Sequence, residues 1–243
     1  MKFSIITVSL NAETLIRDTI ESVLRQDFED YEIIVKDGLS KDKTLEMIPQ
    51  SDKIRIVQKA DTGIYQAMNQ GIAEARGDYL LFLNCGDKFY HESVLSQAAK
   101  ALDNHGPCIL YGNQYFGDLL VCYPHNIAKR HFYSATICHQ ASFIAKELFE
   151  TVGLYDEKLT IASDWKFFLD AKIQKVPFVY FECIVCLSLP GGVSDTAKGH
   201  ELTDKERQQV ISSRFNVFEV LWSKLINSKM LAAFVRLKHK MIK

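Results

Sequence analysis

Segments with strand and helix patterns alternate through the first third of the chain, and this constrains the fold more than any other feature. The apolar segments typical of buried strands are 3–8, 31–35, 54–58 and 79–83. Three segments have the helical spacing of apolar residues: one that follows Asn11, and residues 43–48 and 64–75. Asn11 is placed to cap the first of these helices, with Glu13 in its first turn. Such alternation predicts a parallel, doubly wound sheet covered by helices.

The pattern changes after about residue 107, where shorter strands surround one clear helix. The predicted strands are 109–116, 119–123, 141–145 and 178–187, and the helix is 164–174. Residues 203–242 indicate two further helices, broken near Asn227 and Ser228. We therefore expect an α/β domain over residues 1–202 and a helical extension over 203–243. A chain of 243 residues buries roughly 70–75% of its unfolded surface, so it needs no disulfide or metal to fold.

Polar clusters follow three of the predicted strands at the edge where such sheets bind ligands. They are Asp37-Gly38, residues 61–63 and residues 84–87. Ligands of open α/β sheets bind beyond the carboxyl ends of the strands, so these clusters are candidate site residues. The glycine fingerprints of dinucleotide-binding and P-loop proteins are absent from the sequence.

The composition is that of an ordinary soluble enzyme, with 47% hydrophobic and 24% charged residues, 12 Gly and 5 Pro. These values exclude a disordered chain or a collagen-like repeat. No apolar segment approaches the ~20 residues of a membrane span, and Met1 leads directly into a strand, so we expect a cytoplasmic protein. Cys183 and Cys186 lie on a predicted strand, where positions i and i+3 face opposite sides, so they are expected to be buried thiols and not a metal pair.

The net charge of −1 hides an asymmetry between the body and the C-terminal segment. From Arg214 onward there are seven Lys or Arg and one acid, Glu219, which gives +6 and leaves −7 for the first 213 residues. An acidic body disfavours nucleic acid as a partner. The basic, apolar tail predicts peripheral contact with the inner face of the cell membrane, whose surface is anionic. A helix packed on the catalytic domain with solvated lysines explains the same pattern equally well.

Several ordered motifs resemble those of glycosyltransferase family two. They are residues 4–13 (SIITVSLNAE), 33–44 (IIVKDGLSKDKT), 61–71 (DTGIYQAMNQG), 77–84 (GDYLLFLN), 139–143 (HQASF), 153–156 (GLYD) and 163–165 (SDW). The resemblance covers about residues 2–190. It implies a GT-A fold, a Rossmann-like doubly wound mixed sheet, and an enzyme that uses a nucleotide-sugar donor.

On the donor side, the resemblance implies that Asp37 accepts the base N–H of a uridine nucleotide. It also implies donor contacts from Thr7, Val8, Asp61, Asn69 and Asn84. Residues 84–87 correspond to the family's Asp-x-Asp motif, which holds Mn²⁺ or Mg²⁺ on the donor diphosphate. Here Asn84 and Gly86 replace the usual acids, which leaves Asp87 as the carboxylate ligand and His200 as a possible further one. The alternatives are a solvated turn for Asp37, an ordinary helix residue for Asn69 and a solvated loop histidine for His200.

On the acceptor side, Asp164 matches the family's catalytic carboxylate. An inverting transfer needs a base within hydrogen-bond reach of the acceptor hydroxyl, and the first turn of a helix favours an ionised Asp. The same preference explains Asp164 as a simple capping residue. Trp165 is expected to offer an aromatic face to a sugar ring, and His139 and Gln140 are expected to contact the acceptor or, alternatively, to be ordinary residues at a strand edge.

These expectations combine into an inverting hexosyltransferase. It would transfer glucose from UDP-glucose to an undecaprenyl-diphosphate-linked saccharide in O-antigen, capsule or exopolysaccharide biosynthesis. A nucleotidyltransferase is a first alternative, but it would need a Gly-rich phosphate loop after the first strand, and residues 8–11 (VSLN) contain none. A non-catalytic sugar-nucleotide-binding relative that has lost its metal site is the second, and Asn84 and Gly86 keep it open.

Overall fold

The computed structural model describes residues 1–192 and 195–215, and within them nine strands form one mixed sheet. The strands are β1 (Phe3–Ser9), β2 (Tyr31–Asp37), β3 (Ile54–Gln58), β4 (Tyr79–Phe82), β5 (Lys88–Phe89), β6 (Ile109–Phe116), β7 (Leu119–Val121), β8 (Ser142–Ala145) and β9 (Phe178–Ser188). The helices are α1 (Ile16–Leu24), α2 (Ile64–Glu74), α3 (Val94–Leu102), α4 (Leu148–Thr151), α5 (Ser163–Ile173) and α6 (Ala197–Arg214). Short 3₁₀ turns are η1 (Leu45–Met47), η2 (Lys129–Tyr133) and η3 (His139–Ala141).

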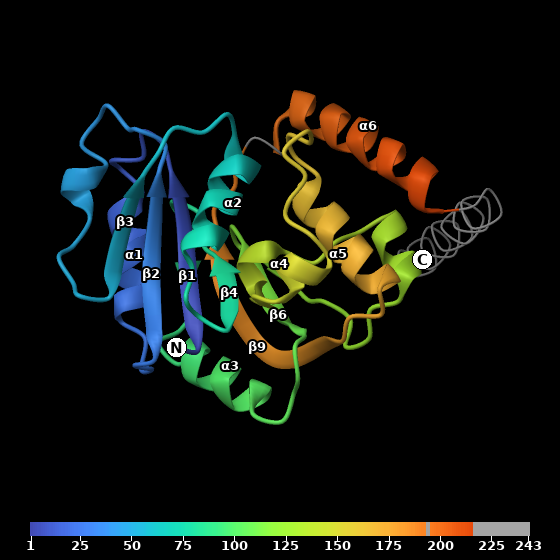
Figure 1. The fold of residues 1–243 in the computed structure, drawn as a ribbon, viewed down its shortest axis with the longest axis horizontal. Coiled ribbons are helices and arrows are strands. Elements are labelled where there is room, and N and C mark those ends of the chain that lie inside the picture. Colours follow the sequence, from blue (N-terminus) through green and yellow to red (C-terminus); the bar gives the residue numbers. More distant parts are fainter. Residues whose placement is uncertain (193–194, 216–243) are drawn as a thin grey trace, which may run out of the picture.

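The sheet has a parallel half and a mixed half. Its order is β3-β2-β1-β4-β8-β6-β9-β5, with β7 paired to β6. Strands β1 to β4 are parallel, β8 is antiparallel to both β4 and β6, β9 is parallel to β6, and β5 is antiparallel to β9. The carboxyl ends of β1, β2 and β4 therefore lie at one edge. In Figure 1 the arrowheads of β1 and β2 point toward the top of the view, where α6 also lies.

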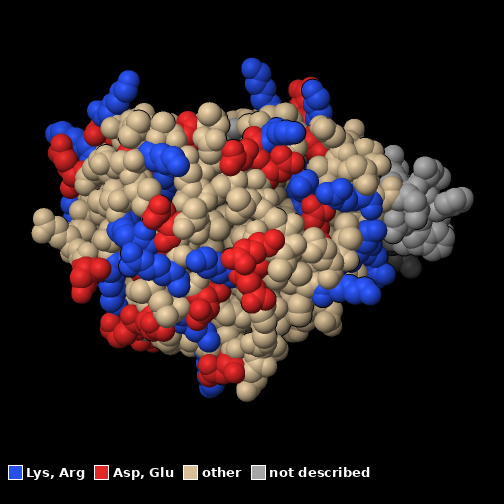
Figure 2. Space-filling model, viewed as in Figure 1, with Lys and Arg blue, Asp and Glu red and all other residues tan. Residues whose placement is uncertain are grey.

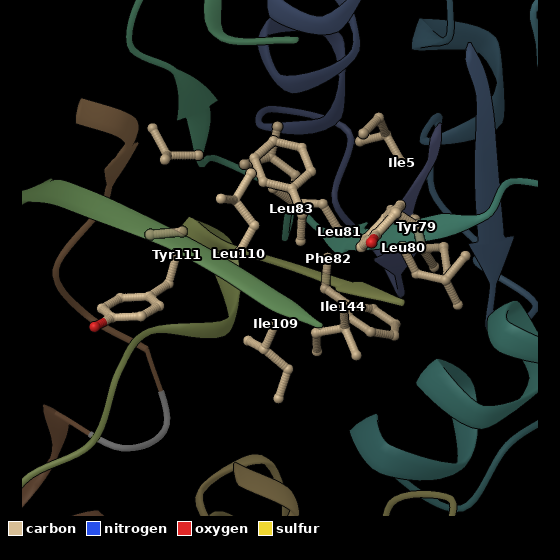
Figure 3. Close-up of a cluster of buried hydrophobic side chains, with 14 of the residues drawn as sticks. Ile5, Tyr79, Leu80, Leu81, Phe82, Leu83, Ile109, Leu110, Tyr111 and Ile144 are labelled. Carbon is tan, nitrogen blue, oxygen red and sulfur yellow. The ribbon is translucent and has the colours of Figure 1, made fainter. Parts of the chain in front are cut away.

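The core is continuous across both halves because the central strands are apolar on both faces. All four residues of β4 are buried, and so are the first five of β1. Figure 3 shows side chains of β1, β4, β6 and β8 meeting, among them Phe82, Leu110 and Ile144. Cys183 and Cys186 of β9 are buried free thiols, as predicted. The burial of so much apolar surface fixes the strands that end at the polar edge.

Several expectations about elements are wrong. Residues 43–48 form only the 3₁₀ turn η1, because Thr44 and its neighbours hydrogen-bond to side chains instead of continuing a helix. Asn11 does not cap α1, whose N-cap is Leu15. Asn11 has a left-handed backbone (φ 51°), and its side-chain oxygen accepts the Lys41 N–H. Helix α3 and strand β5 were not predicted.

The C-terminal part is described only as far as Phe215. Helix α6 begins at Ala197, so the expected boundary between residues 202 and 203 lies inside this helix. The division into two domains stays a prediction, and the expected break near Asn227 lies outside the described residues. No described helix has the length and apolar character to cross a membrane. Figure 2 shows Lys and Arg interspersed with Asp and Glu over the visible face.

Candidate active site

Asp37 ends β2 at the polar edge and is completely buried. Its carboxylate accepts hydrogen bonds from the Ser9 hydroxyl (3.2 Å), the Ser40 N–H (2.9 Å) and the Ser40 hydroxyl (2.5 Å). A carboxylate has about four lone-pair sites, so these three donors leave room for one more. Asp37 is therefore a structural part of the 37–40 turn and not the solvated residue of the alternative interpretation.

Asp61 lies next to Asp37, across Gly38. The fully buried Lys36 ammonium bonds the Asp61 carboxylate at 2.6 Å, and Asp61 itself is 12% exposed. A Cβ at Gly38 would lie 2.9 Å from an Asp61 oxygen, so only glycine allows this approach without displacement. The structure thus brings Asp37 and Asp61, two of the predicted donor residues, together. The buried Lys36 of β2 joins this strand to the loop after β3.

The turn at residues 84–87 is built tightly against α1. The Asp87 N–H bonds the Asn84 carbonyl at 3.0 Å, and Gly86, the third residue of the turn, has φ +98°. Turns with a left-handed third residue favour glycine. The Gly86 N–H donates to the Thr19 hydroxyl (2.8 Å). The glycine found where the family's motif has an acid is therefore required by the backbone of this turn.

Asp87 is 5% exposed and bonded on both oxygens. Gln140 Nε2 donates to Oδ2 (2.9 Å) and the Leu189 N–H to Oδ1 (3.0 Å). Burial raises the pKa of Asp87 above its usual value, and these hydrogen bonds and the nearby His139 offset this only in part. A bound cation would favour the ionised form of Asp87 and lower its pKa again.

The oxygen atoms at this turn fit a divalent ion shared with a diphosphate. Asn84 Oδ1 is buried and has no hydrogen-bond partner, and amide and carboxylate oxygens are ligands that Mg²⁺ and Mn²⁺ accept. Ions of this kind are commonly held by one or two carboxylates plus substrate phosphates. No group of three His, Cys, Asp or Glu side chains suited to a metal occurs among residues 1–192 and 195–215. His200 belongs to no such group and is exposed on the first turn of α6, so the structure does not support it as a ligand.

Asp164, in the first turn of α5, accepts hydrogen bonds on both oxygens. His139 Nδ1 lies 2.8 Å from Oδ2, and the Tyr65 hydroxyl lies 3.0 Å from Oδ1. Burial alone would raise the pKa of Asp164, but the hydrogen bond from His139, with the Trp165 N–H and Tyr65, lowers it below its ordinary value. The carboxylate is thus ionised at neutral pH. Burial and the Asp164 charge raise the pKa of Tyr65, so its hydroxyl stays a donor.

His139 connects Asp164 to the 84–87 turn. Its Nε2 lies 3.1 Å from Asn84 Nδ2. With the amide in this orientation, Nε2 accepts, so the neutral ring carries its proton on Nδ1 and donates it to Asp164. His139 bonds Asn84 and Asp164, and Gln140 bonds Asp87. The expected acceptor contacts of both residues stay predictions.

The expectation that Trp165 offers a binding face is wrong. Trp165 is 1% exposed, donates its indole N–H to the Phe132 carbonyl (3.0 Å) and offers no face to a sugar.

Asn69 fixes the 155–157 segment against α2. Its amide donates to the Tyr155 carbonyl and to Glu157, and accepts the Tyr155 N–H. Its expected contact with the donor stays a prediction.

Thr7 and Val8 lie at the end of β1, as expected. The Thr7 side chain is fully buried and its hydroxyl has no partner, and the Val8 carbonyl accepts the Cys85 thiol (3.3 Å). Neither arrangement tests a donor contact, which stays a prediction.

A surface hollow of about 510 Å³ lies at the opposite edge of the sheet, lined by Arg76, Tyr79 and Lys146 among others, and contains none of the predicted site residues.

Helix α6 supplies two residues that no sequence motif indicated. The buried Glu206 carboxylate accepts the N–H groups of residues 160, 161 and 162 at 2.7, 3.1 and 3.0 Å, just before α5 begins. The Arg207 guanidinium lies over the Trp165 ring, 5.2 Å from its centroid. The polar sequence of α6 gives no local signal for these contacts, whereas Tyr65 lies inside the 61–71 motif.

Solved structures share this fold. Staphylococcus aureus TarS 1-349 in complex with UDP-GlcNAc matches with a TM-score of 0.71 and 19% identity, over 95% of this chain and 72% of that one. A mannosyltransferase of Pyrobaculum calidifontis in complex with GDP-Man and Mn²⁺ matches with a TM-score of 0.63 and 14% identity, over 96% and 80%. The predicted GT-A fold is therefore confirmed.

Sequence relatives extend over most of the chain. An uncharacterized glycosyltransferase of Mycobacterium tuberculosis is 35% identical over 75% of this chain and 73% of its own length. A PGL/p-HBAD biosynthesis glycosyltransferase of Mycobacterium bovis is 29% identical over 94% and 93%. The family model described as glycosyl transferase family 2 matches residues 4–142. With the sheet, the 84–87 turn and the half-buried Asp164 in place, the chain belongs to glycosyl transferase family 2.

Proposed function

We propose that this glycosyltransferase transfers a hexose from a UDP-sugar, with glucose as the first choice, and inverts the anomeric configuration. The observation that carries the proposal is the state of Asp164: an ionised carboxylate, held by His139 and Tyr65, and connected through His139 to the turn that resembles the family's metal motif. This arrangement places a base on one side of the donor site and a phosphate-binding turn on the other.

Asp164 accepts the proton of the attacking acceptor hydroxyl. The low pKa keeps it ready to do so at neutral pH, and the His139 Nδ1–H and Tyr65 hydroxyl orient its two oxygens. Attack in line with the departing nucleotide converts an α-linked donor into a β-linked product. Positioned bases of this kind contribute roughly 10²–10⁴-fold to rate.

On the donor side, Asp37 accepts the base N–H through its remaining lone pair, while Thr7, Val8 and Asp61 line the same edge. Asp87 and Asn84 would hold Mn²⁺ or Mg²⁺, which when bound neutralises charge on the leaving diphosphate. The structures of TarS with UDP-GlcNAc and of the mannosyltransferase with Mn²⁺ support this assignment by fold.

For the acceptor, we propose a saccharide on an undecaprenyl-diphosphate carrier, in O-antigen, capsule or exopolysaccharide biosynthesis. The basic sequence after Arg214 supports a peripheral position at the inner face of the cell membrane, where such a carrier is available.

A thermal-shift screen tests the donor and the metal together. UDP, GDP, dTDP and CMP are each added with Mn²⁺ and with EDTA. A ligand at 100 times its dissociation constant adds about 2.7 kcal/mol, which raises the Tm of a domain this size by several degrees, at about 2–4 °C per kcal/mol. We expect a shift with UDP and Mn²⁺ that is lost in EDTA and in Asp87→Ala. The same shift in EDTA would contradict the metal assignment.

Turnover is then measured as UDP release from UDP-glucose and other UDP-hexoses in the presence of membrane lipid extract. The absence of any nucleotide-dependent shift would contradict the proposed function. A nucleotide-dependent shift without any turnover would favour the non-catalytic sugar-nucleotide-binding alternative, which the single carboxylate of the 84–87 turn allows.

A further inference from the structure

Arg207 lies over the ring of Trp165, the residue that follows Asp164 in the chain. Glu206, its neighbour on α6, binds three successive backbone N–H groups just before α5 begins. Trp165, over which the guanidinium lies, is itself fixed by its bond to the Phe132 carbonyl. Arg207 therefore does not move freely, and its charge is placed by two contacts that involve residues 160–165.

The guanidinium has no hydrogen-bonding partner in the described part of the chain. Its Nε is buried and unbonded. Arg55 and Arg214, by contrast, bind carboxylates: the first Glu32 and Glu74, the second Asp170. Burial lowers the pKa of Arg207, while the charges of Asp164 and Asp204 act in the opposite direction. Removing a guanidinium from water without an ionic partner costs free energy. Binding of an anion offsets this cost.

Its place over the Trp165 ring, one residue along the chain from Asp164, assigns such an anion to the acceptor. The donor diphosphate belongs at the 84–87 turn, and Asp164 stands on the side from which the acceptor hydroxyl attacks. The planar guanidinium fork matches two oxygens of one phosphate or carboxylate group. Asp164 does not pair with it: among the described residues, the side-chain partners of the Asp164 carboxylate are His139 and Tyr65.

We propose that Arg207 binds an oxyanion, phosphate or carboxylate, on the acceptor substrate. The inference rests on the proposed function, because it takes Asp164 as the base. It predicts that the acceptor is negatively charged near the hydroxyl that reacts, either through a carrier diphosphate or through an acidic sugar.

Trp165 offers a direct spectroscopic test. The chain has two tryptophans, Trp165 and Trp222, so Trp222→Phe leaves the ring under Arg207 as the only indole. With saturating UDP and Mn²⁺, this protein is titrated with geranyl diphosphate, which carries the phosphate chemistry, and with glucuronic acid, which carries the carboxylate. Geraniol and glucose are the neutral counterparts.

We expect the fluorescence of Trp165 to respond to one charged probe and to neither neutral one. Arg207→Gln should weaken that binding roughly 10- to 100-fold, and Arg207→Lys should weaken it less, since it keeps the charge but loses the fork. Arg214→Gln, on the same helix, is the matched control and should bind normally. A response to geranyl diphosphate identifies a phosphate, and a response to glucuronic acid identifies a carboxylate.

Equal binding in Arg207→Gln, or no response to either charged probe, would overturn the proposal. The UDP thermal shift, measured on the same samples, separates this result from failure of the proposed function. It also reports whether the Arg207→Gln protein is folded.

Discussion

At the scale of single residues, the ionised state of Asp164 decides the chemistry. Asp164→Asn keeps the shape and the Tyr65 contact but removes the proton acceptor. We expect kcat to fall about 10²–10⁴-fold, with UDP binding, measured by thermal shift, unchanged. Retained turnover in this variant would show that another group is the base.

His139 sets the pH range in which Asp164 acts. Its hydrogen bond lowers the pKa of Asp164 below the ordinary value, so the carboxylate remains ionised, and its folded-state stabilisation persists, until the pH falls through that lowered value. In His139→Gln the hydrogen bond from His139 is lost, so burial raises the pKa of Asp164 with less compensation. We expect the acid limb of the kcat/KM profile to move to higher pH.

The matched control for His139→Gln is His125→Gln. The His125 ring is exposed and stacks on Tyr180, and among the described residues it forms no hydrogen bond or ion pair with Asp164. Its acid limb should stay in place. If the limb of His139→Gln also stays in place, His139 does not govern the ionisation of Asp164.

Sequence reasoning found the chemical groups of the site but not their partners. Asp164 and Asp87 were predicted from motifs, and their roles as base and metal ligand stay predictions. The bond from His139 to Asp164 joins residues 25 positions apart, and the burial of Trp165 depends on Phe132 and α6. Such contacts depend on how the chain closes on itself, which local patterns do not encode.

At the scale of elements, Glu206 on α6 holds the segment that leads into α5, since its carboxylate accepts the N–H groups of residues 160–162. The N-cap residue Ala162 has no side chain that accepts a hydrogen bond. In Glu206→Gln one acceptor oxygen is replaced by an NH₂ that faces backbone donors. We expect a loss of about 1–3 kcal/mol, or roughly 2–12 °C in Tm, and lower turnover because Asp164 is less well placed.

Glu201→Gln is the matched control, since Glu201 is exposed on the same helix. Its Tm should change little. Equal Tm values for the two variants, measured by circular dichroism, would contradict a stabilising role for the bonds from Glu206 to residues 160–162.

The elements themselves were predicted where the periodicity was strong. Strands β1, β2, β3 and β6 and helices α2 and α5 lie within a few residues of their predicted bounds. Helix α3 was missed although Val94, Leu95, Ala98 and Leu102 share its buried face. The predicted helix at 43–48 failed because Asp42 bonds both the N–H and the hydroxyl of Thr44, which competes with helical hydrogen bonding.

At the scale of the whole molecule, the charge asymmetry of the sequence predicts binding to anionic lipid. The full chain should sediment with phosphatidylglycerol vesicles and less with phosphatidylcholine vesicles. Replacing Lys238, Lys240 and Lys243 by Gln should weaken binding by about 1 kcal/mol per lysine, roughly 10²-fold in total, and added salt should have the same direction of effect.

The matched control replaces three exposed lysines of the body, Lys41, Lys59 and Lys158, by Gln. This control should bind vesicles like the unmodified chain. If both triple variants bind equally well, net charge and not the tail attracts the protein to the lipid.

The hold of Glu206 on the segment before α5 also has a consequence for biosynthesis. The ribosome makes the sheet and the helix that carries Asp164 before it makes Glu206, so a nascent chain contains Asp164 before it contains the carboxylate that binds residues 160–162. A transcript cut short ahead of codon 206 would yield a polypeptide in which the N–H groups of residues 160–162 lack this acceptor.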